Sequence, residues 1–256
     1  MPFNYVDVDE AIESDGLRMM VVSNVPSPWG EAAKGIFHVK GLDWSAVRLA
    51  YDDPKLAKWA GELSAPVAVY KDEPPRSRWS DILLLAERLQ PEPALIPGDA
   101  TDRALMFGWA HELLGEEGLG WSRRLQAVEA GFAGEGGFRK PVAQYLAGKY
   151  GYNASLGATY GERVRELLTG LSDRLKAQKA AGSAFYIGDT LSALDIYSAT
   201  TLALFAPLPE DICQMNPDSR AAFLSMDEET RAALDPILLE HRDRMYADVL
   251  ETPLSL

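Results

Sequence analysis

Cysteine and histidine are scarce in this chain. Its 256 residues include one cysteine, Cys213, and three histidines, His38, His111 and His241. A single cysteine excludes an intrachain disulfide and a Cys-x-x-Cys redox pair, and we interpret Cys213 as a buried or incidental thiol. The histidines are widely separated, with no second ligand at metal-binding spacing, so we expect no metal site.

The chain also has few basic residues and no long apolar segment. The chain has 25 Lys and Arg residues against 38 Asp and Glu residues, a net charge of −13. Nucleic acids and anionic membranes are bound by clusters of basic side chains, so neither is an expected partner. No apolar run approaches the roughly 20 residues of a transmembrane helix, and the chain does not begin like a signal peptide. We therefore expect a cytoplasmic protein.

The first third of the chain alternates between strand and helix patterns. Apolar or alternating runs indicate strands, and apolar residues at helical spacing indicate the helices between them. A proline, Pro66, opens the third strand, and Ser80 is positioned to cap the helix that follows. The predicted strands are 17–22, 43–50, 65–70 and 76–78, and the predicted helices are 29–38, 55–61 and a third from residue 80.

A proline-rich segment divides the chain. Three prolines fall within residues 91–100, which reads as a linker because proline excludes helix and removes a backbone donor. Strand patterns disappear after it and helical periodicity dominates. We predict an acidic extension at 1–16, acting as a solvated segment or a dimer-clasping arm, a mixed α/β domain at 17–90 and an α-helical domain at 101–256.

The segment that begins at Gly188 shows how one buried helix starts. Ser192 and Asp195 have the spacing of a capping box, and Leu191 and Ile196 stand at the positions of a hydrophobic staple. The residues that follow are apolar around the whole helix, which is typical of a domain centre. By themselves these residues predict a well-capped core helix.

Together with its preceding glycine, this capping box resembles the start of the central C-terminal helix of glutathione S-transferases. The order of elements before the linker, with Ala65-Pro66 opening a strand, is similar to the thioredoxin-like N-terminal domain of the same family. The resemblance spans nearly the whole chain. It implies a thioredoxin-like α/β domain followed by an all-α domain, a cis bond between Ala65 and Pro66, and a homodimer.

The turn Ser27-Pro28-Trp29 looks like the Ser-Pro-Phe or Cys-Pro-Phe motif of some classes of this family. The resemblance implies that Ser27 stabilises the thiolate of glutathione, the cosubstrate, for attack on an electrophilic small molecule. Ser23 and Asn24 are alternative donors. A serine before proline is also an ordinary helix cap, and that interpretation stays open.

The resemblance also implies where glutathione lies. Ala65, before Pro66, offers backbone hydrogen bonds to the cysteinyl part, and Ser80 holds the γ-glutamyl carboxylate. Trp79 stands where the family has an acidic residue, and Trp29 lies near the ligand. An indole face attracts an ammonium group more weakly than a carboxylate does.

The second substrate of this family sits against the helical domain. Met106, Trp109 and Leu113 lie at helical spacing and are candidates for its pocket, although a packing stripe explains them equally well. Candidates for the mouth of that pocket are Tyr145, Tyr150, Tyr152 and Tyr160.

Two functions follow from the resemblance. The first is a glutathione transferase, or a relative that uses glutathione for peroxide reduction or isomerisation. The alternative is a non-catalytic binding or scaffolding dimer of the same fold. The Ser27-Pro28 turn favours the enzyme, and Trp79 favours the alternative.

Overall fold

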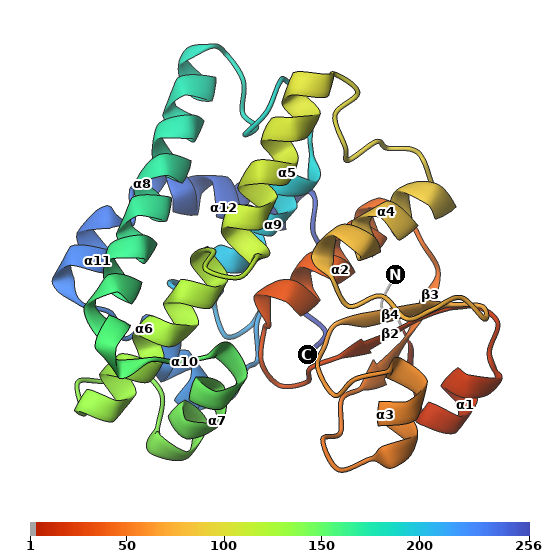
Figure 1. Cartoon of the computed structure of the whole chain (residues 1–256). Coiled ribbons are helices and arrows are strands. Elements are labelled where there is room, and N and C mark those ends of the chain that lie inside the picture. Colours follow the sequence, from red (N-terminus) through yellow and green to blue (C-terminus); the bar gives the residue numbers. More distant parts are fainter. Residues whose placement is uncertain (1–3) are drawn as a thin grey trace.

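The computed structural model describes residues 4–256, and its N-terminal third is built on a four-stranded sheet (Figure 1). The strands are β1 (Asn4–Val6), β2 (Leu17–Val21), β3 (Trp44–Arg48) and β4 (Val67–Tyr70), in the spatial order β1-β3-β2-β4. Strands β1 and β2 run parallel to β3, whereas β4 is antiparallel to β2. The three long predicted strands are confirmed.

Helices cover both faces of this sheet. Helices α2 (Pro28–Val39) and α4 (Trp79–Leu89) lie on one face, and α1 (Val8–Glu13) and α3 (Pro54–Ala60) lie on the other. Successive residues of a strand point to opposite faces, so Met19 of β2 packs with the α2 side and Met20 with the α3 side. This two-sided burial explains why the segment that identified β2 is apolar on both faces apart from Arg18.

The beginning of the chain differs from the acidic extension predicted for residues 1–16. Asn4–Val6 pairs with β3 as an edge strand, and Asp7 then caps α1 by accepting from the Glu10 N–H at 2.9 Å. Asp9 forms an exposed ion pair with Lys55 of α3 at 2.8 Å. Residues 4–13 are therefore part of the folded domain, and residues 14–16 connect α1 to β2. Residues 1–3 of that prediction lie outside the described residues.

The chain from residue 100 onward is helical (Figure 1). Its helices are α5 (Ala100–Leu114), α6 (Leu119–Ala133), α7 (Lys140–Tyr150), α8 (Gly157–Ala180), α9 (Ala193–Leu202), α10 (Pro217–Leu224), α11 (Glu228–Ala233) and α12 (Pro236–Asp248), with a short 3₁₀ turn at Ala154–Leu156. Every residue of α9 is buried, and this helix contacts α2, α5 and α12. Within residues 4–256, none of the helices combines the length with the apolar composition that a membrane span requires.

The predicted capping box is present at the start of α9. Asp195 Oδ2 accepts from both the backbone N–H and the hydroxyl of Ser192, each at 2.9 Å. Its other oxygen, Oδ1, accepts from the Tyr186 N–H at 2.9 Å and lies 3.0 Å from His241 Nε2 on α12. Asp195 is fully buried, so one carboxylate joins the start of α9 to the preceding loop and to α12.

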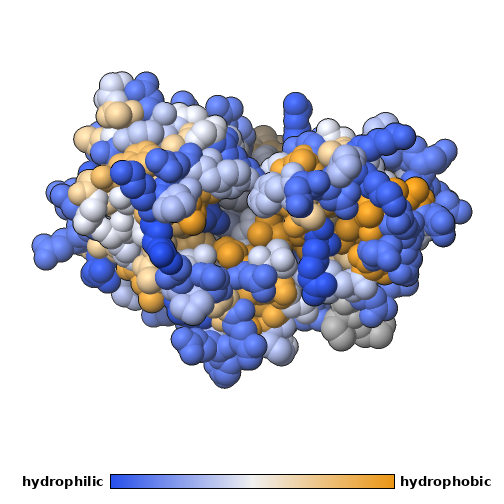
Figure 2. Space-filling model, turned by 90° about the horizontal axis from the view of Figure 1, so that it is seen from below, coloured by the Kyte–Doolittle hydropathy of each residue, from blue (hydrophilic) through white to orange (hydrophobic). Residues whose placement is uncertain are grey.

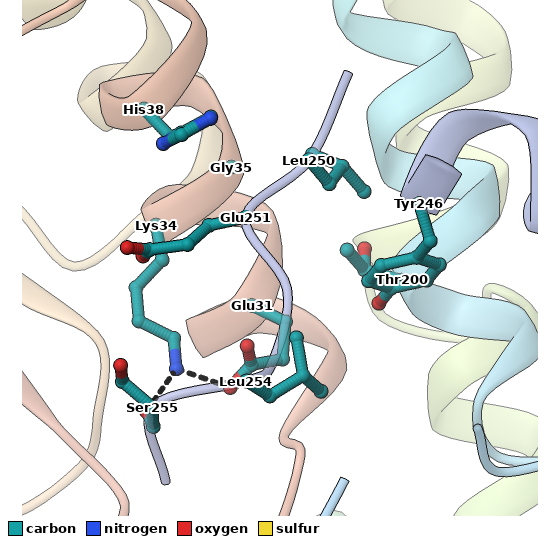
Figure 3. Close-up of a pocket in the computed structure, with 10 residues that line it drawn as sticks. All are labelled: Glu31, Lys34, Gly35, His38, Thr200, Tyr246, Leu250, Glu251, Leu254 and Ser255. Carbon is teal, nitrogen blue, oxygen red and sulfur yellow. Dashed lines mark hydrogen bonds and ion pairs between the residues drawn. The ribbon is translucent and has the colours of Figure 1, made fainter. Parts of the chain in front are cut away.

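The C-terminal segment fixes the back of α2 (Figure 3). The Lys34 ammonium lies 2.6 Å from the Glu31 carboxylate and donates to the Ser255 carbonyl at 2.8 Å. A Cβ atom at Gly35 would lie 2.8 Å from Leu250 Cδ2 and 2.9 Å from Ile196 Cγ2, so only glycine permits this approach. Helix α2 is thereby held between α9 and the chain end, which sets the position of its N-terminus.

Candidate functional site

A cleft of about 340 Å³ separates the sheet domain from helices α6 and α7. Figure 2, which views the side of the molecule that carries α3 and α7 in Figure 1, shows a hollow between the two halves. The sheet domain contributes Ser27, Trp29, Ala65, Pro66 and Ser77 to its lining. The helical domain contributes an aromatic and partly cationic wall. The cleft thus brings together four of the residues proposed to bind glutathione, together with Ser77.

Ser27 stands at the N-terminus of α2, where the helix meets the cleft. Its carbonyl accepts from the Glu31 N–H at 2.8 Å, but its hydroxyl makes no cap hydrogen bond, and no other described residue is bonded to it. The hydroxyl is therefore not occupied by the ordinary capping contact. Of the alternative donors, Ser23 does not line the cleft, and Asn24 lines a neighbouring cavity.

Ala65 and Pro66 form the wall next to Ser27. The peptide bond between them is cis, as the resemblance implies, and β4 begins directly after it at Val67. Ser77 faces the same cleft from the loop before α4. This loop makes only one bridge with the sheet, between Arg76 and Ala68, where the sequence predicted an edge strand at 76–78.

Trp79 and Ser80 do not line the cleft, in contrast to their predicted role. Helix α4 begins at Trp79, with Arg78 as the N-cap, so Ser80 lies inside the first turn and is not the capping residue. The Trp79 ring packs between Phe107 and Tyr197, with centroid distances of 6.0 and 5.7 Å. Trp79 is thus a packing residue between the two domains.

The helical stripe proposed for the second substrate is also placed elsewhere. Met106 and Leu113 are fully buried in the core, and the Trp109 ring packs over Gly170 on α8. None of the three lines the cleft. Helical spacing showed which face of α5 is apolar, but not what covers that face.

Aromatic side chains from α6 and α7 form the opposite wall. Tyr150 stacks with Trp29 at 5.9 Å and meets Trp121 edge-on at 4.8 Å. Tyr145 contacts Tyr51 of the sheet domain at 5.7 Å, which closes part of the mouth. Of the four tyrosines suggested for this mouth, Tyr145 and Tyr150 line the cleft, and Tyr152 and Tyr160 do not.

Charged residues in the cleft were missed by the sequence interpretation. Arg124 and Lys149 line it together with one acidic residue, Glu62. Burial lowers the pKa of the Arg124 guanidinium, and partial burial together with Arg124 lowers the pKa of Lys149. Two consecutive arginines, 123 and 124, among the apolar residues Leu119, Trp121 and Leu125 of a helical segment were the available signal for this site.

Metal-ligating side chains do not converge in the part of the chain that the structure describes. His241 is buried against Asp195, and the thiol of Cys213 is buried, which raises its pKa. The polar groups in the cleft include Ser27 at the N-terminus of α2, the two cations, Glu62 and tyrosine hydroxyls.

Comparison with protein-family models finds no match, and comparison with curated protein sequences finds none either. Solved structures do match. A glutathione S-transferase from Methylobacterium radiotolerans, in complex with glutathione sulfonate, aligns over 94% of this chain and 97% of its own, with a TM-score of 0.61 and 17% identity. A Tau-class enzyme from mango, Mangifera indica, aligns over 90% and 98%, with a TM-score of 0.53 and 18% identity.

A third structure, a glutathione transferase from Pseudomonas putida, has one glutathione disulfide bound per subunit. It covers 92% of this chain and 95% of its own, with a TM-score of 0.55 and 15% identity. These alignments include both the sheet domain and the helical domain. The chain therefore has the glutathione S-transferase fold, as its capping box and its strand order predict.

Proposed function

We propose that this protein binds glutathione in the cleft and activates its thiol for attack on an electrophilic small molecule. The observation that carries the proposal is the unbonded hydroxyl of Ser27 at the N-terminus of α2, beside the cis Ala65-Pro66 wall. Solved structures of the same fold contain glutathione or its derivatives, which supports the choice of ligand.

Stabilisation of a thiolate is the chemical role that suits this position. A helix N-terminus presents unpaired N–H groups and favours a negative charge by about 0.3 to 1 kcal/mol. The Ser27 hydroxyl adds a donor that helps only after the thiol has lost its proton. The thiolate then forms a carbon–sulfur bond with the electrophile, whose leaving group departs with the displaced electron pair. Ser27 itself forms no covalent bond.

The proposed orientation of glutathione follows from the residues of the sheet-domain wall. The cysteinyl backbone pairs with Ala65, next to Pro66, and places the sulfur at Ser27. The γ-glutamyl carboxylate then lies toward Ser77, which faces the cleft, and not toward Ser80. Trp29, whose indole N–H donates to the Leu114 carbonyl at 2.7 Å, forms the floor beside the tripeptide.

Substitution of Ser77 distinguishes binding of the γ-glutamyl carboxylate at Ser77 from binding at Ser80, which the sequence suggested. We expect Ser77→Ala to weaken glutathione binding by roughly 10- to 100-fold, because a hydrogen bond to a charged group contributes about 1.5 to 3 kcal/mol. Ser80→Ala is the matched control and should leave the dissociation constant within about twofold. Titration calorimetry measures both variants, and the opposite ranking would restore Ser80 as the ligand.

A non-catalytic glutathione-binding dimer is the alternative function. Trp79, which favoured it on sequence grounds, packs between the domains and also lines a small cavity with Pro66 and Ser77 of the cleft wall. That its indole in place of a carboxylate weakens glutathione binding stays a prediction of the resemblance. Glutathione binding without ionisation of its thiol would support this alternative. Peroxide reduction or isomerisation by glutathione, a homodimer and a cytoplasmic location stay predictions of the resemblance.

A further inference from the structure

We propose that the electrophile accepted by this cleft carries an anionic group, and that Arg124 binds this group. The inference rests on the proposed function for the reaction itself. The binding of an anion by Arg124 is testable without that reaction.

Arg124 is a buried cation without a counter-ion. Its side chain is 8% exposed, on α6, and its guanidinium lies over the rings of Phe138 and Phe223 at 5.5 and 5.0 Å. Its Nε is buried without a hydrogen-bond partner, and within residues 4–256 no carboxylate or carbonyl is bonded to the guanidinium. A guanidinium carries five donors, and leaving them unpaired in a buried position is costly.

The neighbouring arginine shows the opposite arrangement. The Arg123 guanidinium donates to the carbonyls of Leu204, Phe223 and Ser225 and to the side chain of Gln126. Those bonds join α6 to the end of α9 and to the end of α10, and they account for its burial. Arg124 has no such role and lines the cleft instead. The fold therefore satisfies one arginine internally and leaves the other available to a ligand.

The electrostatics of the cleft favour an anion. Lys149 lines the same cleft, and its pKa is lowered by partial burial and by the charge of Arg124, against a smaller opposing effect of Glu62. Glu62 is the one acidic residue among the described residues that line the cleft, so the cations are in excess. This local excess stands out in a chain whose net charge is −13. A bound carboxylate, sulfonate or phosphate would reduce the repulsion between the two cations and supply acceptors to the guanidinium.

The position of Arg124 assigns this group to the electrophile and not to glutathione. The residues proposed to bind glutathione all lie on the sheet-domain wall, whereas Arg124 lies on the helical wall with Trp121, Leu146 and Tyr150. Apolar and aromatic neighbours suit a ring-bearing substrate, and the guanidinium suits a charged substituent on that ring. The substrate class is therefore an aromatic electrophile with an anionic substituent.

A matched pair of substrates tests this assignment. Glutathione attacks the benzylic carbon of para-(bromomethyl)benzoate or of its methyl ester; a carbon–sulfur bond forms, bromide leaves, and the thiol proton passes to solvent. Relative to the uncatalysed rates, the wild type should prefer the carboxylate. Arg124→Met should lower kcat/KM for the carboxylate by about 10- to 100-fold and for the ester by less than about threefold.

Two further variants control for charge and packing. Arg124→Lys keeps a cation and should retain part of the preference for the carboxylate, although it lacks the planar pair of donors. Arg139→Met removes an exposed cation that pairs with Asp218 outside the cleft, and it should leave both substrates unaffected. Equal losses for both substrates in Arg124→Met, with weaker glutathione binding, would assign Arg124 to glutathione or to packing and would overturn the proposal.

Binding of para-methylbenzoate without glutathione gives a readout independent of turnover. Trp29 and Trp121 line the cleft, so the wild type should show a saturable fluorescence change that Arg124→Met loses. If the wild type binds this anion through Arg124 but transfers neither substrate, the transferase proposal fails and the anion site stands. If wild type and Arg124→Met bind it equally, the anion site is refuted whatever the activity.

Discussion

Replacement of Asp195 by alanine is expected to lower the free energy of unfolding by about 3 to 5 kcal/mol. The substitution removes the acceptor of the Ser192 and Tyr186 backbone N–H groups and the partner of His241, all of them buried. Each buried donor left unpaired costs about 1 to 3 kcal/mol, and loss of one partner of a buried charged network costs about 3 to 5 kcal/mol. Urea unfolding followed by circular dichroism measures the effect.

Ser192→Ala is the graded control for this prediction. It removes a hydroxyl that donates to Asp195 but leaves the Ser192 N–H bonded to the same oxygen. We expect a loss of about 0.5 to 2 kcal/mol. Equal unfolding midpoints for wild type, Ser192→Ala and Asp195→Ala would show that the carboxylate does not hold α9, the preceding loop and α12 together.

Ser27→Ala should reduce the transferase reaction by about 100- to 1,000-fold in kcat/KM while leaving glutathione bound, because it removes one donor to a developing anion. Loss of the Ser27 hydroxyl should also raise the pKa of the bound glutathione thiol toward the value of about 8.5 for a free thiol. The fraction of thiolate increases with pH, so the deficit should be largest near pH 6.5 and shrink above the raised pKa. Ultraviolet absorbance of the bound thiolate, titrated with pH, measures the shift.

Ser23→Ala is the matched control for the role of Ser27. Both serines belong to the turn between β2 and α2, but Ser23 does not line the cleft. In Ser23→Ala, the pKa of the bound glutathione thiol and kcat/KM should equal those of the wild type. If the pKa of the bound thiol shifts in Ser23→Ala and not in Ser27→Ala, then Ser23, and not Ser27, stabilises the thiolate.

Features determined by neighbouring residues could be predicted from the sequence. Apolar runs and helical spacing identified β2, β3, β4 and α2, because burial of one or both faces leaves a periodic signature. The Ser192 and Asp195 pair predicted the start of α9, because capping uses groups three residues apart. These local signals predicted the elements, and their resemblance to the glutathione S-transferase family predicted the fold.

Features that depend on distant contacts could not be predicted in the same way. The start of the chain carries five acidic and no basic residues, and its apolar residues form too short a run to indicate that Asn4–Val6 would pair with β3. The start of α4 is displaced by two residues from its expected cap, and this shift brings Ser77, not Ser80, to the cleft. The apolar stripe on α5 could not show that other helices would cover it and that α6 and α7 would form the wall.

A crystal structure of the protein grown with millimolar glutathione tests the central claim most directly. The proposed function predicts the glutathione sulfur within hydrogen-bonding distance of Ser27 Oγ and the cysteinyl backbone paired with Ala65. It also predicts the γ-glutamyl carboxylate at Ser77 and leaves the space before Arg124 open for the electrophile. A cleft without glutathione at that concentration, or a sulfur directed away from Ser27, would contradict the proposed function.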